Sequence, residues 1–221
     1  LDVNLNPIQK ESDIKKAPPK FKADCILKFI KTGLIVYPSI KSAKCARPSI
    51  INPTSRSKFV QNPDLNKNIE GADILVSQYL DDPNNKNGVR SEVDRYISNY
   101  QLSEPKKEQI INIITYYMFT GTGRGPSARP ADSVLICGKN NRYEFTMCKS
   151  EEEQQNYVRK NWDKYVVSLR GHKKQKNGKI RGNGLKLTGL EPDDKRWACY
   201  YSDKDGVNRP RGALTLRISN K

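Results

Sequence analysis

A carboxylate, a hydroxyl and a lysine are the first side chains along the sequence whose types and spacing could perform chemistry. Residues 23–42 contain two runs of aliphatic and β-branched residues separated by a short turn at Gly33, a pattern that predicts a β-hairpin. A turn centred near Thr32 places Asp24 opposite Lys41. Since side chains alternate along a strand, Ser39 shares the face of Lys41. The sequence therefore predicts Asp24, Ser39 and Lys41 together on one hairpin.

These three side chains suit metal-assisted hydrolysis of a phosphodiester. Mg²⁺ prefers hard oxygen ligands and keeps several waters, so Asp24 with a hydroxyl or a bridging water can hold it when a phosphate completes the shell. We expect that Mn²⁺ can substitute, and that Lys41 faces the attacking water. A hydroxyl at Ser39 binds metal more weakly than a carboxylate, which makes an additional acid desirable. The candidates for that acid are Glu11, Asp13 and a residue before Leu1.

A second predicted hairpin, at 131–148, repeats this spacing. Asp132, Met147 and Lys149 stand in the same intervals as the first set. Spacing alone cannot choose between the two hairpins, but the thioether of Met147 is a poor ligand for Mg²⁺. We therefore interpret the second hairpin as a scaffold, and an active centre there as the less favoured alternative.

The sequence around the first hairpin resembles a known family of nucleases. The segment SIKS at 39–42, followed by RPSIINPTSRSKF at 47–59, is similar to the motif of HpaII-like type II restriction endonucleases of the PD-(D/E)XK superfamily. The acidic helix at 150–158 and the closing basic and aliphatic strand at 211–219 follow the order seen in those enzymes. Residues 60–120 show no recognisable similarity, so the resemblance covers about half of the chain.

The resemblance implies Mg²⁺-dependent, site-specific cleavage of double-stranded DNA to a 5′-phosphate and a 3′-hydroxyl. Asp24 would bind the metal, Lys41 would be the catalytic lysine, and Ser39 would occupy the usual carboxylate position. It also implies a restriction-modification enzyme of the prokaryotic cytoplasm, with a DNA methyltransferase as genetic rather than binding partner. Palindromic sites favour a homodimer, while a monomer stays open. The recognition sequence and the cut position do not follow from these residues.

The charge balance agrees with a nucleic-acid partner. The chain has 221 residues with 40 Lys and Arg against 24 Asp and Glu, a formal net charge of +16, which attracts polyanions. No apolar run is long enough for a bilayer span, so we expect no membrane association. The five cysteines form no CxxC pair and suggest reduced intracellular thiols, and a single histidine gives no support to Ser-His-Asp chemistry.

Further candidates for contact with DNA are polar or basic residues in predicted loops and at strand ends. They are Ser42, Lys44, Arg47, Ser49, Asn52, Thr54, Ser55, Arg56, Arg124, Arg129, His172, Lys173, Lys174, Lys176, Arg181, Asn183, Arg209 and Arg211. Those between 171 and 184 belong to a loop rich in Lys, Gly and Asn that we expect to contact DNA.

The predicted elements indicate an α+β fold, with a mixed, mainly antiparallel sheet flanked by helices around a restriction-endonuclease-like core. We expect one domain over 1–221, in which 1–20 form an extended lead-in. The expected helices are at 69–80, 91–100, 103–119 and 151–161, the last with a capping box at its start. Two alternatives remain: a non-catalytic basic protein that binds nucleic acid, such as an RNA or ribosome factor, and a ribonuclease toxin.

Overall fold

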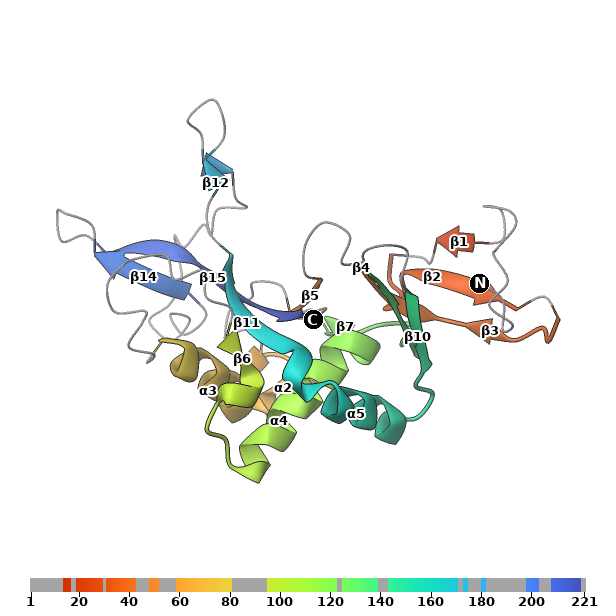
Figure 1. Cartoon of the computed structure of the whole chain (residues 1–221), viewed down its shortest axis with the longest axis horizontal. Coiled ribbons are helices and arrows are strands. Elements are labelled where there is room, and N and C mark those ends of the chain that lie inside the picture. The colour runs from red at the N-terminus through yellow and green to blue at the C-terminus, as the bar shows by residue number, and fades with distance from the viewer. Residues whose placement is uncertain are drawn as a thin grey trace. The chain divides into compact units, whose positions relative to one another are not determined.

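The computed structural model groups the chain into two compact units, each formed from separate stretches of sequence (Figure 1). The first unit takes in Leu1–Pro48 and Ile114–Lys160, and the second takes in Ser49–Ile113 and Asn161–Ser219. The described residues are 14–16, 19–29, 31–42, 48–51, 59–80, 95–122, 125–138, 143–170, 173–174, 180–181, 198–202 and 208–219. The single endonuclease domain expected from the sequence stays a prediction.

The first unit begins with a small antiparallel sheet in the order β1-β2-β3. Its strands are β1 (Ile14–Lys16), β2 (Cys25–Lys28) and β3 (Ile35–Val36). Gly33 has a φ of 67° in the connecting turn, a conformation that favours glycine, and its N–H donates to the carbonyl of Phe29 at 2.8 Å. The first predicted hairpin is thus confirmed. The expected lead-in is wrong at Ile14–Lys16, because this segment pairs with β2.

The strand after β3 changes partner, and this makes the sheet mixed. β4 (Pro38–Ser42) pairs in parallel with β9 (Ser133–Cys137), which pairs antiparallel with β10 (Tyr143–Met147). The second predicted hairpin is therefore confirmed as well. The side chains of β2 and β3 that face inward, with Phe29, form a core against which Ile40 and Met147 pack.

The register of the first hairpin differs from the expected one. Leu27 pairs with Val36 and Lys28 with Ile35, so the turn lies slightly earlier than predicted. The expectation that Asp24 is directly opposite Lys41 is wrong, because the Asp24 N–H donates to the carbonyl of Pro38 at 2.9 Å. The carboxylate therefore lies level with the first half of β4.

Two helical elements complete the described part of the first unit. The helix α5 (Glu151–Lys160) has the predicted capping box, in which Ser150 Oγ accepts from the Glu153 N–H and Glu153 Oε2 accepts from the Ser150 N–H, both at 3.1 Å. The turn Tyr116–Thr120 is π-helical. Beyond it, part of the region expected to be a loop forms a short hairpin of β7 (Gly121–Thr122) and β8 (Gly125–Pro126).

The second unit has a five-stranded sheet in the order β14-β15-β11-β6, with β5 also paired to β15. Its strands are β5 (Ser49–Ile51), β6 (Arg95–Tyr96), β11 (Tyr165–Arg170), β14 (Ala198–Ser202) and β15 (Asn208–Ile218). Its helical elements are α2 (Pro63–Asn66), α3 (Ile69–Leu80), η3 (Ile97–Asn99), η5 (Trp162–Lys164) and α4 (Glu104–Thr115), the last of which continues into Tyr116–Thr120.

The helices predicted at 69–80 and from 103 are confirmed. The helix predicted at 91–100 is wrong at Arg95–Tyr96, which is a strand, while Ile97–Asn99 forms one 3-10 turn. Arg95 and Tyr96 instead pair with Val167 and Val166 of β11, because the sheet supplies partners that local sequence does not reveal. Within the loop expected at 171–184, β12 (Lys173–Lys174) and β13 (Ile180–Arg181) form a two-stranded antiparallel ribbon.

The described elements therefore have the α+β class expected from the sequence, with β4 and β9 paired in parallel in a mainly antiparallel arrangement. Within the described ranges, no helix is both long and apolar enough to cross a membrane.

Candidate active site

The carboxylate of Asp24 is fixed to the strand that carries Ser39 and Lys41. Asp24 precedes β2, and its Oδ2 accepts the backbone N–H of Ile40 at 2.6 Å. Because the Asp24 N–H also donates to Pro38, backbone and side chain both hold the aspartate against β4. The side chain is otherwise exposed, which leaves the carboxylate accessible to a ligand.

Ser39 and Lys41 share the buried face of β4, as the alternation rule predicted. Their side chains are 1% and 7% exposed, respectively. Ser39 Oγ is buried and has no hydrogen-bond partner, and within the described part of the chain neither a hydrogen bond nor an ion pair reaches the Lys41 ammonium. A buried polar group without a partner is costly, so Ser39 Oγ is available to a ligand that would satisfy it.

Burial lowers the pKa of Lys41, and the nearby Asp24 carboxylate acts in the opposite direction. Loss of water disfavours the ammonium form, whereas a negative charge favours it. Since burial is the larger effect, Lys41 gives up its proton more readily than an exposed lysine. That property suits a group that takes a proton from water or donates one to an oxyanion.

Lys22 is a fourth member of the site, and the sequence interpretation missed it. Its pKa is lowered to about 8, chiefly by burial and also by the charge of Lys41, against the opposing effect of Asp24, so Lys22 lies within electrostatic range of both. The Lys22 N–H donates to the carbonyl of Arg129 at 2.9 Å. Alternation from Asp24 back to Lys22 was the available signal, but the segment precedes β2 and its neighbours come from far along the chain.

The charges at the site favour an anion. Two lysines, Lys22 and Lys41, lie near one carboxylate, Asp24. Among the described residues, no group of three His, Cys, Asp or Glu side chains could hold a metal ion. Asp24 and Ser39 still offer hard oxygen donors of the kind that Mg²⁺ prefers. They could hold such an ion together with a phosphate, whose charge offsets that of the lysines.

Asp132, the acid of the second hairpin, binds the backbone next to β4. Its Oδ1 accepts the Tyr37 N–H at 2.7 Å and the hydroxyl of Ser133 at 3.0 Å, and its own N–H donates to the Tyr37 carbonyl at 3.1 Å. One carboxylate oxygen is thus committed to holding the junction of β3 and β4. Asp24 makes the same kind of bond to a backbone N–H of β4, so this bond does not by itself separate the two hairpins.

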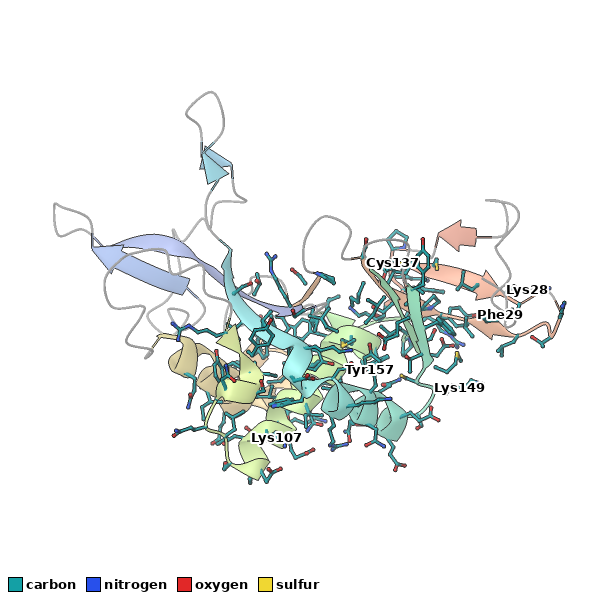
Figure 2. The ribbon with its side chains drawn as sticks, viewed as in Figure 1. Lys28, Phe29, Lys107, Cys137, Lys149 and Tyr157 are labelled. Atoms are coloured by element: carbon teal, nitrogen blue, oxygen red, sulfur yellow. The ribbon has the colours of Figure 1, made fainter. Side chains whose placement is uncertain are left out.

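Lys149 takes part in the cap of α5 rather than in a site with Asp132. Its backbone N–H donates to Glu153 Oε2 at 2.6 Å, and its side chain is exposed. Figure 2 shows Lys149 where β10 gives way to α5. The matching spacing of the two hairpins therefore does not correspond to matching geometry.

Arg129 borders the same part of the first unit. Its guanidinium lies over the ring of Tyr37, 4.2 Å from the centroid, and Phe21 contacts that ring edge-on with centroids 6.3 Å apart. Arg129 is exposed, so its charge can also meet a ligand. This is one of the residues expected to contact DNA.

The structure describes some of the other predicted DNA contacts and leaves the rest outside the described residues. Ser42 lies exposed at the end of β4, whereas Ser49, Lys173, Lys174, Arg181, Arg209 and Arg211 lie on strands of the second unit. The following candidates lie outside the described residues: Glu11, Asp13, Lys44, Arg47, Asn52, Thr54, Ser55, Arg56, Arg124, His172, Lys176 and Asn183.

Comparison of the chain with protein-family models and with curated proteins gives no match. The similarity to HpaII-like endonucleases therefore rests on the residues of the sequence motif alone.

Proposed function

We propose that this protein is a Mg²⁺-dependent type II restriction endonuclease of the HpaII-like group, which hydrolyses phosphodiesters in double-stranded DNA. The observation that carries the proposal is the hydrogen bond from the Ile40 N–H to Asp24 Oδ2, at 2.6 Å. It fixes an exposed carboxylate to the strand on which Lys41 is buried without a hydrogen bond or ion pair in the described structure. The SIKS motif supports the same assignment.

Lys41 supplies the proton chemistry in this proposal. Its Nζ would hydrogen-bond the attacking water, accept a proton from it, and offset the negative charge that develops on the phosphate oxygens. The lowered pKa favours this role, because a lysine that loses its proton more readily than an exposed one can both accept and return a proton. In-line attack on phosphorus would break the bond to the 3′-oxygen and leave a 5′-phosphate.

Asp24 and Ser39 would hold the metal ion in this proposal. Bound Mg²⁺ polarises the phosphate and makes its bound water more acidic. Asp24 keeps one carboxylate oxygen for the Ile40 N–H, so it would offer the other, and Ser39 Oγ has no competing hydrogen bond. A further acid, for which Glu11 and Asp13 remain the candidates, would strengthen the site.

Double-stranded DNA is the proposed substrate because the charge around the site and over the whole chain is positive. The formal net charge is +16, and Arg129 and Ser42 are exposed in the same unit as Asp24. Basic residues neutralise phosphates and fix the duplex, while contacts with base edges give sequence specificity. The two-stranded ribbon of β12 and β13, which carries Lys173, Lys174 and Arg181, would add phosphate contacts.

Digestion of unmethylated phage DNA by the purified chain tests the proposal. We expect discrete fragments with MgCl₂ or MnCl₂ and intact DNA with excess EDTA, and sequencing of the fragment ends would give the site and the cut position together. Total RNA in a parallel reaction serves as the control for a ribonuclease. DNA that is bound but never cut would contradict the proposal in favour of a non-catalytic binding protein, and cutting that EDTA does not diminish would contradict its metal dependence.

A further inference from the structure

Lys22 is held at the candidate site by a segment far away in the sequence. The N–H of Lys22 donates to the carbonyl of Arg129, the N–H of Ala128 donates to the carbonyl of Lys20 at 3.2 Å, and Phe21 forms an isolated parallel bridge with Arg129. The backbone around Lys22 is therefore fixed on both sides of the residue. A lysine on a fixed backbone loses less conformational freedom on binding than one in a loop.

Two lysine charges converge on one carboxylate at this point. Lys22 is half-buried and within electrostatic range of Lys41 and Asp24, and in the described structure no hydrogen bond or ion pair engages its ammonium group. Like charges brought together in a partly desolvated place destabilise each other, and Asp24 supplies only one negative charge against the two lysines. With both lysines protonated and before any metal ion is counted, the two lysines and the aspartate carry one net positive charge, which one phosphodiester neutralises.

We propose that Lys22 binds the DNA phosphate that occupies the candidate site, as a second lysine beside Lys41. This inference rests on the proposed function, because it takes the anion to be the backbone of the DNA substrate. Lys41, on the buried face of β4, contacts the attacking water and the reacting phosphate. Lys22, at the edge of the site and ahead of β2, grips the phosphate and neutralises its charge. A phosphate is favoured over a carboxylate ligand because Asp24 already supplies one carboxylate at the site.

The test compares Lys22→Met, Lys22→Arg and the control Lys31→Met. Lys31 is exposed in the turn after β2, so its replacement removes one positive charge from the same unit at a position away from Asp24. DNA binding is measured by fluorescence anisotropy in EDTA over a range of salt concentrations. Cleavage is measured as a single-turnover rate with Mg²⁺, and thermal melts establish that each variant is folded.

We expect Lys22→Met to reduce the magnitude of the salt slope of binding by about one unit and to slow cleavage about tenfold to a hundredfold. Lys22→Arg should restore the slope and most of the rate, because the charge is kept. Lys31→Met should change the rate less than twofold. Rescue by arginine separates phosphate binding from a purely structural role of the lysine stem.

The inference is overturned if folded Lys22→Met has the slope and the single-turnover rate of the wild type, or if it matches Lys31→Met in both. It is also overturned if Lys22→Arg is as impaired as Lys22→Met. These failures differ from failure of the proposed function, which would appear as absence of cleavage by the wild type itself. If the wild type binds DNA but does not cut it, a salt slope that falls by about one unit in Lys22→Met would still show that Lys22 binds phosphate.

Discussion

Replacement of Lys41 by methionine should stabilise the fold and abolish cleavage. The lysine is 7% exposed, and in the described part of the chain no ion pair or hydrogen bond compensates the cost of burying its ammonium group. Methionine has a similar length, no charge and a flexible side chain that adapts to the space. Exchange of a poorly compensated buried charge for an apolar side chain commonly stabilises a protein by about 1–3 kcal/mol, which in a domain of this size raises Tm by about 2–10 °C.

The pH dependence of this gain has a defined sign. Burial holds the pKa of Lys41 below its unfolded value of 10.5, so the cost of the charge is fully present below the folded pKa and is relieved as pH rises from there toward 10.5. The advantage of Lys41→Met over the wild type should therefore be largest below the folded pKa of Lys41 and shrink as pH rises from there toward 10.5.

Urea unfolding at a series of pH values measures this difference directly. Lys28→Met is the matched control, because Lys28 is exposed on β2 and should change the free energy of unfolding by less than about 0.5 kcal/mol. A Lys41→Met variant that is destabilised by more than about 1 kcal/mol at pH 7 would refute the reasoning, since the ammonium would then have a stabilising partner in the fold. A stability advantage of Lys41→Met that grows with pH would refute the predicted direction of the pH dependence.

The remaining predictions concern the cap, the basic ribbon and the metal. Ser150→Ala should lower the free energy of unfolding by about 1 kcal/mol in a urea titration, because it removes the acceptor for the Glu153 N–H; an unchanged midpoint would contradict the cap. Joint neutralisation of Lys173, Lys174 and Lys176 should lower the salt slope of DNA binding by up to about three units, and an unchanged slope would mean that this segment does not meet phosphate. Ca²⁺ should support DNA binding measured by anisotropy without efficient cutting in a plasmid assay, because the ion holds the phosphate but activates water poorly; cutting as fast as with Mg²⁺ would contradict this.

Local signals in the sequence were sufficient for elements that depend on neighbouring residues. The turn at Gly33, the apolar period of Ile69–Leu80 and the capping box at Ser150 predicted a hairpin, a helix and a helix start that the structure has. Each of these signals operates within a few residues, where backbone conformation and side-chain hydrogen bonds decide the outcome.

Features that depend on distant residues escaped prediction. The parallel pairing of β4 with β9 and the bond from Tyr37 to Asp132 join parts of the chain 95 residues apart, and nothing local announces either. The strand at Arg95–Tyr96 forms because β11 offers it partners, which overrides a helical pattern.

The residues of the candidate site also differ in whether local sequence or distant contacts determine their positions. Alternation along one strand correctly placed Ser39 and Lys41 on one face, whereas the position of Asp24 depended on a register that the turn shifted. Lys22 joins the site through a backbone bond to Arg129, more than a hundred residues further along the chain, and so could not be assigned from spacing.

Cleavage by single variants of the two hairpins tests the central claim, that Asp24 and Lys41 form the active centre. Plasmid cutting with Mg²⁺ is measured for Asp24→Ala, Lys41→Ala and Lys149→Ala, with thermal melts and DNA binding alongside. We predict that the first two are folded, bind DNA and do not cut, while Lys149→Ala cuts at a rate close to that of the wild type. A folded Lys149→Ala that is inactive, together with a Lys41→Ala that still cuts, would contradict the assignment.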